Sequence, residues 1–170
     1  NARLLDATSG EELWTKTYEG KSADLATLPR EIALRIASAL EGKLSPSERN
    51  RLASTGTKSQ EALSLYLKGR YFANQRTATA YRLAIDYFGR AVRADSQYGA
   101  PWAGLARIYA AQGMSGQLTP AESRDRARAA ALRAVALDDS LAEAHAALAV
   151  YLQAYDWRPT DTEREYRRAI

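Results

Sequence analysis

The chain has 170 residues, of which 46% are hydrophobic and 26% charged, and it carries a net charge of +4. This composition excludes an intrinsically disordered chain, and the lack of any apolar run of about 20 residues argues against a membrane span. No cysteine occurs, which excludes disulfides and thiolate metal sites. We expect a cytoplasmic location, with an extracytoplasmic or periplasmic position in a membrane-anchored parent left open.

The first residues predict a small β-structure. Asn1 and Ala2 have the character of an expression-tag remnant. Stretches 3–7 and 12–18 hold strand-compatible residues on either side of a turn that contains Gly10, which predicts a hairpin. Because two strands alone are marginal in water, the hairpin should belong to a larger sheet or lean on the following helix.

Helical signals follow. Apolar residues recur every four positions from Pro29 to about Leu40, and Ser45-Pro46-Ser47-Glu48 predicts the start of a short second helix. The Gly- and Ser/Thr-containing segment 54–58 is the predicted linker. We therefore expect one domain over residues 1–56 and another over residues 57–170.

Beyond the linker the pattern predicts helices over 59–75, 80–94, 98–112, 121–137, 141–155 and 161–170. Three of their starts have the capping-box pattern, a hydroxyl residue followed three positions later by glutamate, at Thr119, Ser140 and Thr160.

Two sets of marker residues recur in this region. A small residue lies three positions before a bulky one at Gly69, Ala106 and Ala149, at intervals of 37 and 43 residues. The second set consists of Phe88, Ala131 and Tyr166, each of which is followed by an alanine three positions later. Such spacing predicts a repeat of helix pairs.

These markers, with Leu65, Trp102 and Leu148 among the accompanying residues, resemble the tetratricopeptide repeat (TPR) family over residues 59–170. The resemblance implies an all-α superhelix of three antiparallel helix pairs, the last truncated, in which small residues let the helices approach closely. The proline that commonly closes each unit is replaced by Ser96 and Asp139. Proteins of this family usually bind other proteins or peptides.

Segments 65–72 and 156–170 are also similar to the TPR region that follows a TolB-like α/β domain in bacterial signalling proteins, whose parents are kinases, nucleotide cyclases or winged-helix regulators. Residues 1–56 would then be the C-terminal remnant of the TolB-like domain, with its last hairpin and helices. No catalytic motif occurs in the chain, so we expect a sensory or scaffold part without enzymatic activity or cofactor. Two alternatives stay open: intramolecular regulation of a kinase or cyclase, and self-association as a homodimer through an exposed terminal helix.

The resemblance also implies a binding groove lined by the first helix of each pair. The residues it places there are Tyr66, Arg70, Asn74, Arg107 and Gln153. Because Arg70 and Arg107 occupy equivalent positions, they should be neighbours, and two adjacent guanidinium groups favour a carboxylate or an acidic peptide. In the alternative interpretation, each arginine pairs with a local Asp or Glu.

Other conspicuous residues receive structural interpretations. His145 is the only histidine, which makes a metal site improbable and a structural role near a helix start the better interpretation. Trp14, Trp102 and Trp157 are expected in the core or at junctions. The arginines between 124 and 133 alternate with acidic residues nearby and predict a solvated helix face, so nucleic acid is not an expected partner.

Overall fold

The computed structural model describes residues 2–5, 12–17 and 56–170. The predicted turn at Gly10, the predicted helix from Pro29 to Leu40 and the short helix expected after Ser45 lie outside these residues. The chain divides into two compact units, Asn1–Thr55 and Gly56–Ile170.

The first unit contains two described strands, β1 (Ala2–Leu5) and β2 (Glu12–Lys16). They pair antiparallel, with Leu4 opposite Trp14, and the register becomes irregular between Leu4 and Leu5. The origin of residues 1–56 in a TolB-like domain stays a prediction.

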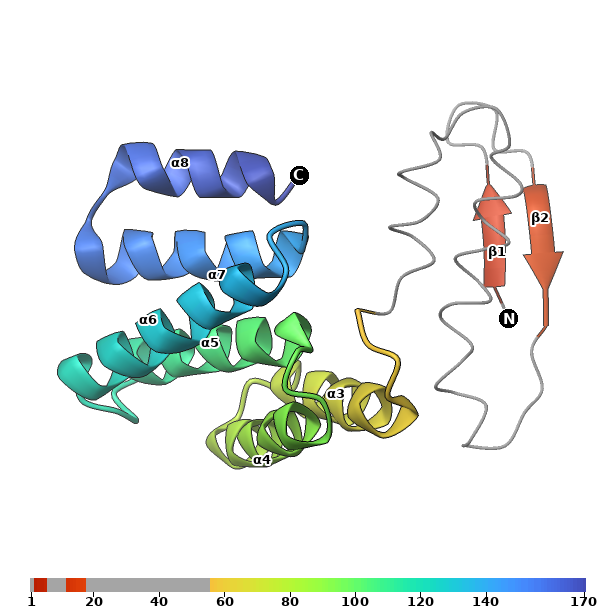
Figure 1. Cartoon of the computed structure of the whole chain (residues 1–170), viewed down its shortest axis with the longest axis horizontal. Helices are drawn as coiled ribbons and strands as arrows, with labels where there is room; N and C mark the ends of the chain where they lie inside the picture. Colours follow the sequence, from red (N-terminus) through yellow and green to blue (C-terminus); the bar gives the residue numbers. More distant parts are fainter. Residues whose placement is uncertain (1, 6–11, 18–55) are drawn as a thin grey trace. The chain divides into compact units, whose positions relative to one another are not determined.

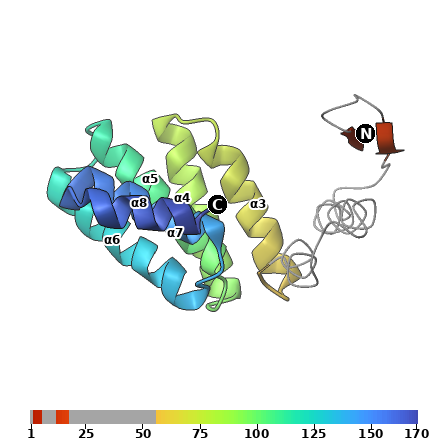
Figure 2. The same ribbon diagram turned by 90° about the horizontal axis from the view of Figure 1, so that it is seen from above.

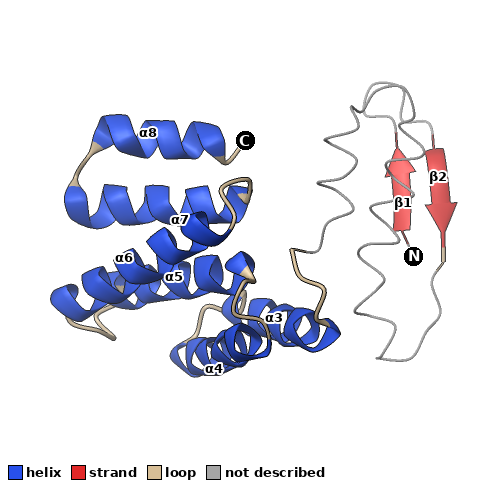
Figure 3. Cartoon of the chain, in the orientation of Figure 1, coloured by secondary structure: helices blue, strands red, loops and turns tan. Residues whose placement is uncertain are grey.

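The second unit is helical, and short loops join its helices (Figure 3). The elements are α3 (Gln60–Ala73), α4 (Ala78–Ala94), α5 (Gly99–Met114), α6 (Pro120–Leu137), α7 (Ala142–Tyr151), the π-helical turn η2 (Leu152–Asp156) and α8 (Pro159–Arg168). All six predicted helices are confirmed. The sixth begins two residues earlier than expected, and the fifth is interrupted by η2.

Successive helices pack as pairs: α3 with α4, α5 with α6, and α7 with α8 (Figure 1). The second helix of one pair also packs against the first helix of the next, as α4 does against α5 and α6 against α7. Seen from above, α7 and α8 lie over α5 and α6 (Figure 2). Because α5 also contacts both α3 and α7, the three first helices α3, α5 and α7 are neighbours.

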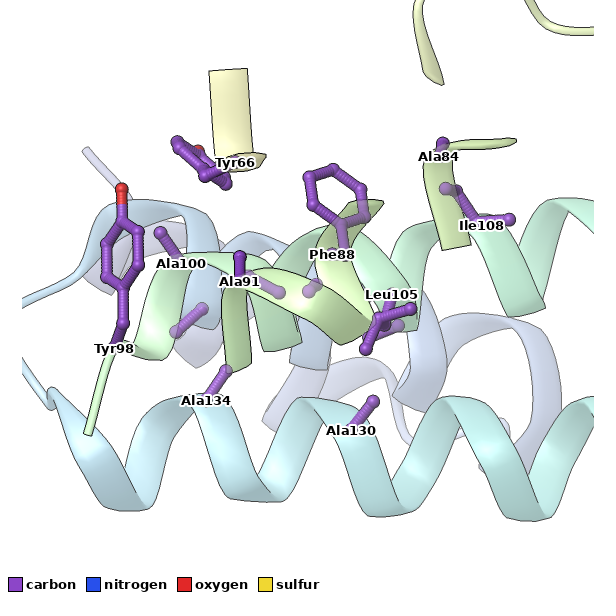
Figure 4. Close-up of a cluster of buried hydrophobic side chains, with 14 of the residues drawn as sticks. Tyr66, Ala84, Phe88, Ala91, Tyr98, Ala100, Leu105, Ile108, Ala130 and Ala134 are labelled. Atoms are coloured by element: carbon purple, nitrogen blue, oxygen red, sulfur yellow. The ribbon is translucent and has the colours of Figure 1, made fainter. Parts of the chain in front are cut away.

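Phe88 of α4 forms the centre of the first junction (Figure 4). Its ring lies where two glycines allow close approach, Gly69 on α3 and Gly104 on α5. A Cβ atom would lie 2.5 Å from the nearest ring carbon at Gly69 and 2.6 Å from it at Gly104. Both distances are shorter than the contacts that Cβ atoms make in proteins. The two glycines therefore make room for one aromatic side chain between three helices.

Alanines fill the second junction. Ala106 of α5 is 2% exposed, and Ala131 and Ala134 of α6 are fully buried. These small side chains let α5 and α6 approach closely over their length. In the third pair the small marker Ala149 is fully buried and its bulky partner Leu152 is 7% exposed, whereas Tyr166 of the second marker set is 38% exposed. The marker pattern thus corresponds to the core in the first two pairs and only partly in the third.

One of the three predicted capping boxes is confirmed. The Thr119 hydroxyl accepts from the Glu122 amide, and the Glu122 carboxylate accepts from the Thr119 amide. The Thr119 hydroxyl also donates to the Glu122 carboxylate, and this hydrogen bond and the one from the Thr119 amide lower the pKa of Glu122.

The other two predicted capping boxes are wrong. At α7 the N-cap is Leu141, because the amide and hydroxyl of Ser140 donate to the Asp138 carboxylate instead. At α8 the helix starts at Pro159, a residue whose fixed φ suits the first helical turn, so Thr160 lies inside the helix.

The turn η2 brings Tyr155 to α6. The Tyr155 hydroxyl is hydrogen-bonded to the hydroxyl of the buried Ser123, which also donates to the Tyr109 carbonyl oxygen at 2.7 Å. Gly113 lies against this pair, since a Cβ there would come within 2.1 Å of the serine oxygen. The contact holds the end of the α7–η2 segment to the α5–α6 pair.

Candidate binding surface on the first helices

Tyr66 is the centre of the candidate site. It lies on α3 and is 8% exposed, and its ring centroid is 5.8 Å from that of Phe88 and 5.2 Å from that of Tyr98 (Figure 4). Tyr98 is the N-cap residue of α5 and meets Tyr66 edge to face. The two tyrosines therefore join α3 to the start of α5.

Three charged side chains act on these tyrosines. The Arg70 guanidinium carbon lies 5.8 Å from the centroid of the Tyr66 ring. Burial raises the pKa of Tyr66, with Glu143 adding to the rise and Arg70 and Arg107 opposing it. Burial likewise raises the pKa of Tyr98, and the neighbouring Tyr66 and Glu143 add to that shift.

We name these five residues, Tyr66, Tyr98, Arg70, Arg107 and Glu143, the Tyr66 cluster. Its members come from all three first helices and from the N-cap of α5. Of the residues predicted there, Tyr66 and Arg70 of α3 are in contact, and Arg107 of α5 joins the cluster through the effect of its charge on Tyr66.

Neither Arg70 nor Arg107 forms an ion pair with a carboxylate of the described residues, and both side chains are exposed. The arginines of α8 behave differently, as Arg164 and Arg167 each pair with an acidic residue of the same helix. Local pairing of Arg70 or Arg107 is therefore not seen in the part of the chain that is described. Open guanidinium groups beside an aromatic ring can bind carboxylates in a forked geometry.

The other two predicted site residues, Asn74 and Gln153, are not members of the Tyr66 cluster. Asn74 is the exposed C-cap of α3, and its backbone N–H donates to the Arg70 carbonyl oxygen at 3.1 Å. Gln153 is an exposed residue of η2 that accepts a hydrogen bond from the Tyr166 hydroxyl of α8 at 3.2 Å. The structure thus engages Gln153 with α8 rather than with Tyr66.

Sequence reasoning missed Tyr98 and Glu143. Glu143 drew attention only as the last residue of a predicted capping box, and Tyr98 falls outside the marker pattern. A comparison of the three units would have found Glu143, because it lies two turns before Val150, the residue that follows the third small marker as Arg70 and Arg107 follow theirs.

A second polar cluster, at the α7–α8 pair, was also missed. His145 is 1% exposed; its Nδ1 lies 2.7 Å from Glu165 Oε2 and its Nε2 lies 2.8 Å from the Asp139 carbonyl oxygen. Burial opposes ionisation of Glu165, but contacts with His145 and Arg164 outweigh it and lower the pKa of the carboxyl group. No sequence motif joins these residues, because Glu165 follows His145 at a distance of 20 positions.

The tryptophans differ in burial. Trp102 of α5 packs against the core, and its Nε1 is buried without a hydrogen-bond partner in the described chain. The expectation of a packed Trp157 is wrong: the residue is 85% exposed and has a left-handed backbone with φ of 48°. It caps the end of η2, so the backbone conformation turns the side chain away from the core. Of Trp14, the described structure gives the position in β2 opposite Leu4.

Within the described ranges no three His, Asp or Glu residues are arranged to hold a metal ion. None of the helices described is both long and apolar enough to cross a membrane.

No family model and no solved structure matches the chain. A similar curated protein comes from Rhizobium meliloti (strain 1021) and is named "Putative adenylate cyclase 3". It is 30% identical over 108 residues, which are 64% of this chain and 18% of that protein. The chain therefore spans less than a fifth of the length of this relative.

Proposed function

We propose that residues 57–170 form a TPR-like module that binds a protein or peptide and serves as the sensory or scaffold part of a bacterial signalling protein. The packing order supports this, because each second helix contacts the following first helix and the first helices are neighbours. The similarity to a protein named as an adenylate cyclase is compatible with a signalling context.

The observation that carries the proposal is the open state of Arg70 and Arg107 beside Tyr66. Two exposed guanidinium groups on adjacent helices reinforce each other's field, which attracts an anionic ligand. An acidic peptide supplies carboxylates for both arginines, while its apolar parts can contact the Tyr66 ring. We further propose that this region binds without catalysing a reaction, because its sequence contains no catalytic motif.

The test is binding of acidic and basic peptide pools to the parent chain and to the double variant Arg70→Gln, Arg107→Gln. The acidic pool should bind the parent more tightly, and the preference should disappear in the variant. Binding should also weaken as salt is raised, because exposed charges are screened over about 8 Å at physiological ionic strength.

The matched control is the double variant Arg82→Gln, Arg133→Gln. Both arginines are exposed on second helices and form no ion pair with the described carboxylates, so the variant removes the same net charge. If the control loses as much binding as the first variant, attraction by net charge explains the result and the proposed site is rejected.

The name of the relative favours a second candidate, regulation of a nucleotide cyclase within one longer chain. In that case the Tyr66 cluster would bind a segment of the same protein. Cyclic-nucleotide formation by the longer protein should then change when Arg70 and Arg107 are both replaced by glutamine. An unchanged rate would reject this candidate and leave binding of a separate partner in place.

A further inference from the structure

Glu143 is an open carboxylate within the Tyr66 cluster. It is exposed in the first turn of α7 and forms no ion pair with the described residues, although Arg70 and Arg107 belong to the same cluster. An arginine in contact with Glu143 would neutralise it, but the two signs of charge remain apart. The cluster therefore presents an anionic position and a cationic position at the same time.

The positive and negative charges lie toward different ends of the first helices. Glu143 lies in the first turn of α7, which packs against α5, whereas Arg107 lies past the middle of α5. Arg107 lies one residue after the marker Ala106, whereas Glu143 lies six residues before the equivalent Ala149. At about 1.5 Å per residue, this register separates the two positions by about 10 Å along the helices, and the spacing of about 9 Å between packed helices brings their separation to about 14 Å.

We propose that Glu143 selects a basic side chain in the bound peptide, so that the preferred ligand carries a cation as well as the acidic group held by Arg70 and Arg107. This inference rests on the proposed function. An extended peptide advances about 3.3 Å per residue, so a separation of about 14 Å corresponds to a lysine and an aspartate about four positions apart. A purely acidic peptide leaves Glu143 unpaired and brings like charges together, which disfavours it.

The test uses three peptides with acetylated and amidated ends, so that neither terminus contributes charge. One carries aspartate alone, one lysine alone, and one carries both residues four positions apart. Dissociation constants are measured for the parent, for Glu143→Gln, and for the control Glu163→Gln, which removes an exposed carboxylate from α8. Thermal melts establish that each variant is folded.

The parent and the control should bind the mixed peptide about two- to fivefold more tightly than the acidic peptide, the range of an exposed charge pair. In Glu143→Gln the two peptides should bind equally, and in Glu143→Lys the acidic peptide should become the better ligand. If the preference for the mixed peptide persists in Glu143→Gln, the role of Glu143 is overturned.

The outcomes separate this inference from the function on which it rests. If acidic binding survives in Arg70→Gln, Arg107→Gln, the binding site itself is wrong. If acidic binding requires both arginines but the parent shows no preference for the mixed peptide, only the selection by Glu143 is rejected.

Discussion

Phe88 occupies space that glycine leaves open on two neighbouring helices. A glycine inside a helix normally costs about 0.5–1 kcal/mol relative to alanine, because the chain loses more conformational freedom on folding. At Gly69 and Gly104 a Cβ atom would overlap the Phe88 ring, so packing outweighs helix propensity there. Gly89 on α4 has no such neighbour, since the nearest atom to its Cβ position is a flexible Arg93 nitrogen at 3.7 Å.

This contrast predicts opposite effects of the same substitution. Gly89→Ala should raise the free energy of unfolding by about 0.5–1 kcal/mol, because only helix propensity changes. Gly104→Ala should lower it by about 1–3 kcal/mol, because overpacking against Phe88 exceeds the gain in propensity. Urea unfolding of both variants measures the difference, and equal shifts would show that Phe88 is not held as described.

The small marker Ala106 makes a second prediction at this scale. Ala106→Leu should lower the free energy of unfolding by about 1–3 kcal/mol, because the side chain is enclosed between closely packed helices. The control is Ala129→Leu, at an exposed position of α6, which should change stability by less than about 0.5 kcal/mol. Thermal unfolding that does not distinguish Ala106→Leu from this control would contradict the alignment of the units.

At the scale of the element, the buried hydrogen bond between Glu165 of α8 and His145 of α7 holds these two helices together. The contact joins the two helices of the third pair, in which Tyr166 of the second marker set is more exposed than its counterparts Phe88 and Ala131. Polar contact thus replaces part of the apolar packing that holds the first two pairs.

The lowered pKa of Glu165 predicts how α8 responds to acid. Its ordinary value is 4.5, and the value in the folded chain is lower, so the carboxylate stabilises the fold above about pH 4.5. That contribution is lost as the pH falls through the folded value. Glu165→Gln should therefore lower stability at about pH 7, and the difference from the parent should shrink toward about pH 3.

Urea midpoints at both pH values measure this effect. Glu163→Gln serves as the control, because Glu163 is exposed and pairs only with Arg167 on the helix surface. A difference between Glu165→Gln and the parent that stays constant over the pH range would contradict the assignment.

The helix starts illustrate what sequence could and could not predict. All six helices follow from helix-like stretches with start signals, although the apolar stripe is weak in α5, α6 and α7. The capping boxes expected at Ser140 and Thr160 are wrong because of competing local interactions. The Ser140 hydroxyl donates to the Asp138 carboxylate, and Pro159 begins α8 before Thr160. The sequence thus predicts that a helix exists more securely than it predicts where the helix begins.

At the scale of the whole helical unit, the candidate site depends on which helices become neighbours. The equivalent positions of Arg70 and Arg107 could be read from the repeat, and both side chains lie in the Tyr66 cluster. Tyr98 and Glu143 could not, since their proximity to Tyr66 arises from stacking of α5 and α7 rather than from local spacing. The contact of Gln153 with Tyr166 is of the same kind, because the π-helical turn shifts the register after Tyr151.

The central claim is that an acidic ligand binds on the first helices at Tyr66, Arg70 and Arg107. The most direct measurement is a titration of ¹⁵N-labelled protein with an acidic peptide, followed by backbone amide chemical shifts. The account predicts that the largest shifts occur on α3 and α5 around these three residues, and that they disappear in Arg70→Gln, Arg107→Gln. Largest shifts on α4, α6 or α8, or shifts that persist in the double variant, would contradict it.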